Sequence, residues 1–133
     1  MRTEVVGNIR RSQDLSEPPY YALCTLDGTL SLFEQKEDRL IWSLQTSHQL
    51  FGLHKLDVTN DAAEEVIVTS WDGMTYIVNH LRQNVHFQFP RPCHAFAAGR
   101  YALTAGHNNP VLLYATCDDE LVMYWGVSLT EIP

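Results

Sequence analysis

The sequence predicts an all-β fold of about three four-stranded β-propeller blades that do not close a ring. Two observations support this prediction: a pattern that repeats every 45 or 46 residues, and the lack of any ten-residue stretch with helical apolar spacing. The repeat is clearest at the aspartates that open three turns, since Asp72 follows Asp27 by 45 residues and Asp118 follows Asp72 by 46. About 45 residues is the length expected of one four-stranded blade.

Each repeat is centred on a β-hairpin, in which two apolar or β-branched runs are joined by a short turn. The hairpins are predicted over residues 24–33 and 69–78, with a weaker third copy over 115–124. We expect Asp27-Gly28 and Asp72-Gly73 to be the structural turns. A two-residue type I′ turn would give both residues of each pair a positive φ angle.

One strand is expected before each hairpin and another after it. The apolar segments 5–7, 50–52 and 95–97 are 45 residues apart and are predicted to form the inner strands. The alternating segment 40–44 stands 45 residues before 85–89, and both are predicted to be outer strands. Each complete repeat therefore supplies four antiparallel strands.

The predicted blades cover residues 3–45, 48–89 and 93–126, and the third blade lacks its outermost strand. Closed propellers contain about four to eight blades. We therefore expect residues 1–133 to be part of a longer propeller, as a truncated or splice form. A β-sandwich is the alternative fold, but it predicts no alignment at a fixed long period.

Composition argues against several classes of partner. The chain carries 9 Lys and Arg against 16 Asp and Glu, a formal charge of −7, whereas nucleic acids and anionic membranes favour clustered cations. We expect no nucleic-acid partner and no direct membrane insertion, since no run approaches 18 apolar residues. Three cysteines without zinc or disulfide spacing, no signal peptide and no N-x-[ST] sequon favour a cytoplasmic setting.

No sequence motif points to catalysis. The six histidines form neither an H-x₃-H nor an HExxH spacing, and there is no G-x-S-x-G, phosphate-binding glycine loop or C-x-x-C. A propeller enzyme or lectin would place polar groups on the inner strands, around the central channel, but the predicted inner strands are apolar. We therefore expect no catalytic residue, no cofactor and no enzymatic activity.

One loop of the second blade has the spacing of a cation site. Oxygen side chains occupy its positions 1, 3, 5 and 9, as Asp57, Thr59, Asp61 and Glu65. This spacing lets a tight loop wrap oxygen ligands around a hard cation such as Ca²⁺. However, Ala62 stands where such loops usually need a glycine, and the other blades do not repeat the pattern. A solvated acidic loop is therefore favoured over a calcium site.

At this loop the sequence resembles an FG-GAP repeat, the blade unit of integrin α-subunit propellers. Phe51-Gly52 is similar to the FG element, and residues 57–65 are similar to the cation loop of that repeat. The resemblance implies a propeller of the FG-GAP or WD-like type. A calcium-dependent extracellular adhesion propeller of the integrin type is therefore one alternative function, and a propeller enzyme or lectin is another.

Along its length the chain is similar to the C-terminal blades of the eukaryotic integrin-alpha FG-GAP repeat-containing family. The similarity is found in segments 18–22, 24–29, 56–59, 64–66, 71–77 and 122–125. It implies a non-enzymatic subunit of the KICSTOR complex, with the GATOR complex as a partner. It also implies negative regulation of TOR kinase signalling when amino acids or glucose are scarce, by a cytoplasmic protein recruited to the lysosomal membrane.

Overall fold

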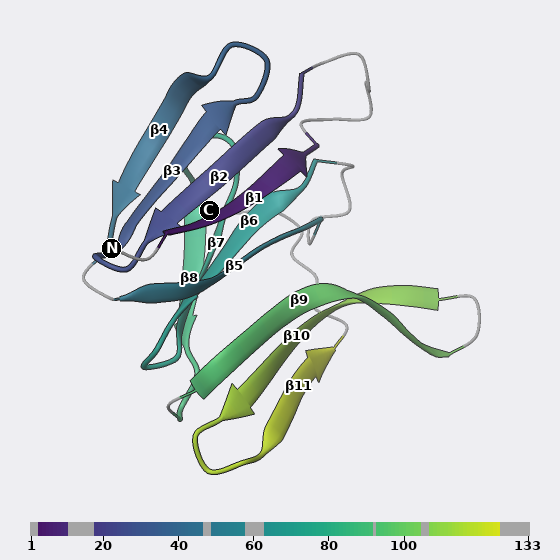
Figure 1. The fold of residues 1–133 in the computed structure, drawn as a ribbon. Helices are drawn as coiled ribbons and strands as arrows, with labels where there is room; N and C mark the ends of the chain where they lie inside the picture. The colour runs from purple at the N-terminus through teal and green to yellow at the C-terminus, as the bar shows by residue number, and fades with distance from the viewer. Residues whose placement is uncertain are drawn as a thin grey trace.

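A computed structural model of the chain describes residues 3–10, 18–46, 49–57, 63–91, 93–104 and 107–125. The described residues form three antiparallel sheets (Figure 1). They contain no helix, and therefore none that is long and apolar enough to cross a membrane. The prediction of an all-β fold is confirmed.

Each sheet is a meander in which sequence neighbours pair. The first sheet contains β1 (Thr3–Ile9), β2 (Tyr20–Thr25), β3 (Thr29–Glu34) and β4 (Arg39–Gln45) in that order. The second contains β5 (Leu50–Leu56), β6 (Glu65–Ser70), β7 (Met74–Val78) and β8 (Asn84–Gln88). The third contains β9 (Cys93–Thr104), β10 (His107–Thr116) and β11 (Leu121–Trp125), and β9 and β10 extend well past β11 (Figure 1).

The second sheet packs between the other two, and β6 shows this most clearly because all six of its residues are buried. Alternate side chains of a strand point to opposite faces of the sheet. Val66 and Val68 accordingly join a core cluster with the first sheet, whereas Ile67 joins a second cluster with the third sheet. The face-to-face stacking of successive sheets is the arrangement of neighbouring propeller blades.

The turn inside each hairpin differs from the prediction in its backbone geometry. Gly28 and Gly73 have φ angles of +99° and +93°, but neither Asp27 nor Asp72 has a positive φ. The Gly73 amide donates to the Ser70 carbonyl at 3.0 Å, so two non-glycine residues form the turn and the glycine follows them. This is the three-residue hairpin with a bulge glycine. The predicted type I′ turn is therefore wrong, although both glycines are needed.

The 45-residue spacing holds for the hairpins and fails for the strands that flank them. Gln45 pairs with Thr29 and Gln88 pairs with Met74, so the outer strands repeat at 43 residues rather than 45. The inner strands also depart from 45. The inner-strand residues at equivalent positions are those that pair with the same place in each hairpin: Val5 with Leu23, Leu53 with Val68, and Phe96 with Tyr114. Leu53 follows Val5 by 48 residues, and Phe96 follows Leu53 by 43. The predicted alignment of the inner and outer strands is therefore wrong in register.

Candidate functional site

The predicted cation loop is only partly visible in the structure. Asp57 directly follows β5 and Glu65 begins β6, and both are buried, with 6 % and 2 % of their surface exposed. Thr59 and Asp61 lie outside the described residues. Among the residues that the structure describes, no three His, Cys, Asp or Glu side chains are grouped to hold a metal ion. The preference for an acidic loop over a calcium site stays a prediction.

Glu64, next to this loop, ties the first two sheets together. Its carboxylate accepts the Arg10 amide at 2.8 Å and the Lys55 ammonium at 3.0 Å, while its own amide donates to the Arg10 carbonyl at 2.8 Å. Lys55 also donates to the Asn8 carbonyl at 2.7 Å. These contacts join the end of β1 to the second sheet, so this glutamate has a structural role.

The hairpin turns of the three sheets share one polar arrangement. In each turn a hydroxyl donates to the carboxylate two residues later, and the residue after that carboxylate has a positive φ angle. In the third turn Asp119, with φ of +68°, takes the place of the glycine. The hydroxyl–carboxylate pairs are Thr25–Asp27, Ser70–Asp72 and Thr116–Asp118.

A glutamine at the end of the outer strand braces each of the first two turns. The Gln45 side-chain amide donates to the carbonyls of Asp27 and Thr46 at 3.1 and 3.0 Å. In the second turn the Gln88 side-chain amide donates in the same way, to the Asp72 carbonyl at 2.6 Å and to the Phe89 carbonyl at 2.9 Å. The two braces fix where the outer strand ends relative to the turn.

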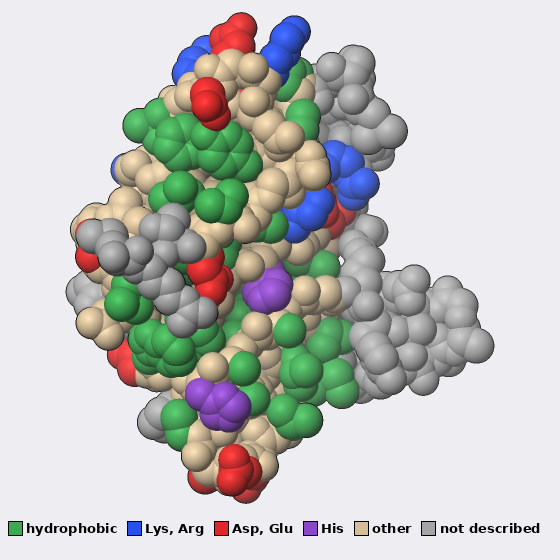
Figure 2. All heavy atoms as spheres, viewed as in Figure 1, with side chains coloured by type: hydrophobic (Ala, Val, Ile, Leu, Met, Phe, Trp, Pro, Cys, Tyr) green, Lys and Arg blue, Asp and Glu red, His purple; other side chains and the backbone are tan. Residues whose placement is uncertain are grey.

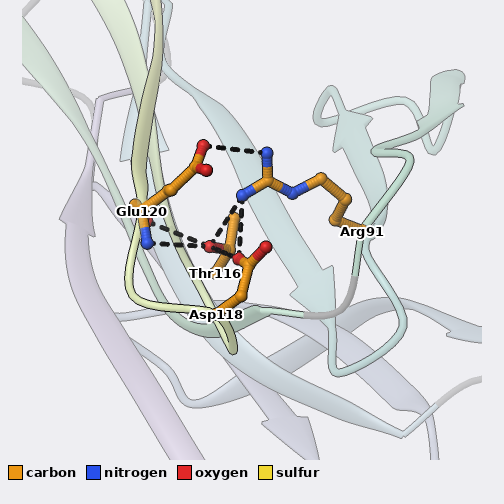
Figure 3. A network of polar contacts seen from close by, with 4 residues as sticks. All are labelled: Arg91, Thr116, Asp118 and Glu120. Carbon is orange, nitrogen blue, oxygen red and sulfur yellow. Dashed lines mark hydrogen bonds and ion pairs between the residues drawn. The ribbon is translucent and has the colours of Figure 1, made fainter.

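The third turn is held by Arg91, which lies between β8 and β9 (Figure 3). Its guanidinium donates to Glu120 at 3.1 Å and to both Thr116 Oγ1 and Asp118 at 2.9 Å. The pKa of Asp118 is lowered, first by the Thr116 hydroxyl and then by Arg91. Arg91 therefore clamps the third sheet to the end of the second.

The two buried cysteines, Cys24 and Cys93, are poor nucleophiles. Burial is the main cause that raises the pKa of Cys24, to about 11, and it also raises the pKa of Cys93. A thiol must ionise to act as a nucleophile, and these two stay protonated at neutral pH. The third cysteine, Cys117, is exposed at the third turn.

Exposed apolar side chains are the remaining surface feature. Figure 2 shows hydrophobic side chains gathered over the first sheet and over the third. On β11, Leu121, Met123 and Tyr124 are 73 %, 43 % and 40 % exposed. Protein-interaction surfaces are enriched in such aromatic and methionine side chains.

Sequence reasoning identified the turn residues and missed their polar partners. Gln45 and Gln88 each stand at the end of an alternating apolar segment. Aligning the two segments at 43 residues, rather than at 45, would have matched the two glutamines and indicated a shared role. Arg91 and Glu120 are 29 residues apart and meet only through the packing of the sheets. No local pattern could have paired them.

Comparisons with known proteins place this arrangement in a family. A family model described as "Integrin-alpha FG-GAP repeat-containing protein 2" matches residues 1–129. The chain is 47 % identical over 132 residues to the mouse (Mus musculus) protein named "KICSTOR complex protein ITFG2", covering 98 % of the chain and 30 % of the relative. It is 50 % identical over 121 residues to the cattle (Bos taurus) protein of the same name, covering 91 % of the chain and 23 % of the relative. The chain thus spans less than a third of each relative.

A solved structure also resembles the fold. It is the β-propeller in "Crystal structure of BBS1N in complex with ARL6DN, soaked with mercury". The TM-score is 0.67 at 18 % sequence identity, and the match covers 96 % of this chain and 37 % of the other. This likeness shows the fold alone, and it confirms that the sheets are blades of a β-propeller that this chain does not close.

Proposed function

The chain belongs to the integrin-alpha FG-GAP repeat-containing protein 2 family, and from this premise we propose that it is a non-catalytic scaffold within the KICSTOR complex. The observation that supports the proposal best is the shared name of its relatives, each a KICSTOR complex protein. The identity of 47–50 % extends over most of this chain, and on that basis we expect the same assembly.

The geometry of the described residues supports a scaffold rather than an enzyme. The polar groups at the turns are bonded to one another, as Ser70 is to Asp72 and Arg91 is to Glu120. Catalytic groups, in contrast, converge on a site that a substrate can enter. Among the described residues, apolar side chains are exposed on all three sheets or their turns, and those of Leu121, Met123 and Tyr124 on β11 suit contact with protein partners.

The proposal extends to the cellular role that the family resemblance implies. The chain would act with the GATOR complex in the negative regulation of TOR kinase signalling when amino acids or glucose are scarce. It would be a cytoplasmic protein that reaches the lysosomal membrane through the complex. The acidic balance of the chain, 9 Lys and Arg against 16 Asp and Glu, fits recruitment through protein contacts rather than through anionic lipid.

The proposal can be tested by affinity purification from fed and nutrient-starved cells. The tagged chain should recover KICSTOR and GATOR subunits and should appear in the lysosomal fraction. A matched control is the BBS1N propeller, which shares the fold at 18 % identity and should recover neither complex. Recovery of KICSTOR subunits no greater than with this control would contradict the proposal.

A further inference from the structure

The chain contains two lysines, Lys36 in the turn between β3 and β4 and Lys55 on β5. Lysine side chains are the usual acceptors of acetyl groups and of ubiquitin-type modifiers. Both lysines lie among the residues that the structure describes, and their surroundings differ in a way that decides which of them can react.

Lys55 is held in the junction between the first and second sheets. Its ammonium donates to the Asn8 carbonyl at 2.7 Å and to the Glu64 carboxylate at 3.0 Å, and its side chain is 32 % exposed. An ammonium is not a nucleophile, because its nitrogen has no free electron pair until it loses a proton. Lys55 must therefore break two hydrogen bonds and leave the junction before its nitrogen can attack an acyl group.

Lys36 lies in an exposed turn whose ends are fixed. The four residues of this turn, 35–38, are all exposed, and they join β3 to β4 (Figure 1). The Gln35 amide donates to the Pro19 carbonyl at 2.9 Å, and the Tyr21 hydroxyl donates to the Asp38 carboxylate at 2.5 Å. In the described part of the chain, Lys36 makes no hydrogen bond or ion pair. Its amine is therefore held in solvent on an anchored turn.

The second sheet shows that a turn at this place stays exposed when another sheet packs beside it. By the 45-residue spacing of the hairpins, Lys36 corresponds to Leu81 in the segment 79–83. That segment contacts the first sheet, since the Trp42 indole donates to the His80 carbonyl at 3.0 Å. Leu81 is nevertheless 65 % exposed. A sheet packed before the first one in the same way would therefore leave Lys36 exposed as well.

We propose that Lys36 is the acyl-acceptor site of this chain, at which an activated thioester transfers its acyl group to Nζ. The neutral amine attacks the thioester carbonyl carbon, the C–N bond forms and the C–S bond breaks. The thiol leaves, and the extra proton of the amine passes to a base in solution. Acetyl-coenzyme A and the C-terminal thioester of a ubiquitin-type modifier share this chemistry.

An acyl group on Lys36 would mark the chain without unfolding it. The contacts that hold the first junction together belong to Lys55 and Glu64, and Lys36 takes no part in them. Acetylation would remove one positive charge from an already acidic chain, and a ubiquitin-type modifier would add a folded protein at the turn. The inference goes beyond the proposed function, because it holds whichever complex the chain joins.

The first test compares the two lysines in the unaltered chain. The folded chain is treated with a limiting amount of acetyl-coenzyme A in mildly alkaline solution, and peptide mass spectrometry follows the acetylation of each lysine. We expect Lys36 to react about tenfold faster than Lys55, because Lys55 must first lose two charge-assisted hydrogen bonds. In urea-unfolded chain the two rates should be similar. Equal rates in the folded chain would overturn the proposal.

The second test asks which thioester is the source in cells. The tagged chain is isolated with proteasomes and deacetylases inhibited, and Lys36→Arg and Lys55→Arg are its matched variants, since both keep the positive charge. After trypsin digestion, a diglycine remnant on Lys36 identifies a ubiquitin-type modifier, and an acetyl group identifies acetyl-coenzyme A. The modification should be lost in Lys36→Arg and retained in Lys55→Arg. Absence of both groups from Lys36, or their presence on Lys55 instead, would refute the assignment.

Discussion

The Tyr114 hydroxyl lies 2.5 Å from Thr75 Oγ1, across the packed junction between the third and second sheets. Both side chains are fully buried, and Thr75 also reaches Thr69 at 3.2 Å. The equivalent place in the first junction holds Cys24, Leu30 and Val68, which are apolar in character. At this position the second junction therefore has a hydrogen bond between two hydroxyls, whereas the three side chains at the same place in the first junction are apolar.

Tyr114→Phe should destabilise the fold by about 1 kcal/mol, the usual net value of a buried hydrogen bond. The ring remains stacked on Phe89, at 4.1 Å between centroids, so the change removes the hydroxyl and little packing. The free energy of unfolding in urea measures the effect. Tyr124→Phe is the matched control, because that side chain is 40 % exposed and its loss should cost nothing measurable. Equal midpoints for Tyr114→Phe and the native chain would contradict the role of the hydroxyl.

Gly73→Ala should destabilise the fold by about 1–3 kcal/mol. The φ angle of Gly73 is +93°, and a Cβ atom there would lie 2.6 Å from the Phe89 carbonyl oxygen. Thermal unfolding measures the loss. Gly99→Ala is the control, since a Cβ on that glycine meets no atom within 4 Å. A melting temperature that falls equally in both variants would mean that the turn geometry is not the cause.

The hairpins were predictable from sequence because their signal is local. Gly28 and Gly73 sit within a few residues of the strands that they join, and only glycine takes their φ angles without strain. The offset of the outer strands depends instead on how each strand pairs with its neighbour. The pairing of β3 with β4 shifts register between Leu32 and Phe33, the pairing of β7 with β8 has no such shift, and no spacing rule reveals that difference.

The polar contacts between sheets could not be predicted from the sequence for a related reason. Arg91 meets Glu120, and Glu64 meets Arg10, only after separate sheets have packed together. The sequence separations are 29 and 54 residues. Single-sequence patterns report contacts within one strand or hairpin, so they predicted the blades and left the contacts between blades unassigned.

Asp119→Gly should stabilise the third sheet by about 0.5–1 kcal/mol, because glycine takes a positive φ angle without the steric cost that other residues pay. Asp119 occupies the glycine position of the turn with φ of +68°, a conformation that costs L-residues more than glycine. The change also removes one negative charge beside Asp118. A rise in melting temperature is the expected result, and Asp118→Gly should instead lower it, because that carboxylate accepts from Thr116 and Arg91. A fall for Asp119→Gly would contradict the assignment of the turn.

Calcium at 1 mM should leave the melting temperature unchanged relative to EGTA. Ala62 replaces the loop glycine, and a ligand stabilises a fold only in proportion to its occupancy. Magnesium serves as the ionic control. A rise with calcium that is absent in Asp57→Ala would instead establish the site and favour the adhesion alternative. Each variant is compared with and without calcium, so the stability lost by the substitution itself does not enter.

The Cys24 thiol should make the fold less stable as the solution becomes alkaline. Burial first, and the Glu4 carboxylate second, raise the pKa of this thiol from 9.0 to about 11. Between these values the unfolded chain has released the proton and the folded chain retains it. The free energy of unfolding therefore falls as pH rises from about 9 to 11, by on the order of 2 kcal/mol, and the contribution is constant below pH 9.

Urea unfolding at closely spaced pH values tests this dependence. Cys24→Ala should show a shallower decline between pH 9 and 11 than the native chain, whatever its stability at neutral pH. Cys117→Ala is the control, because that cysteine is exposed and its removal should leave the native slope. Burial also raises the pKa of Tyr114, which steepens the decline at higher pH equally in all three proteins. Identical slopes for Cys24→Ala and the native chain would show that the buried thiol does not control alkaline stability.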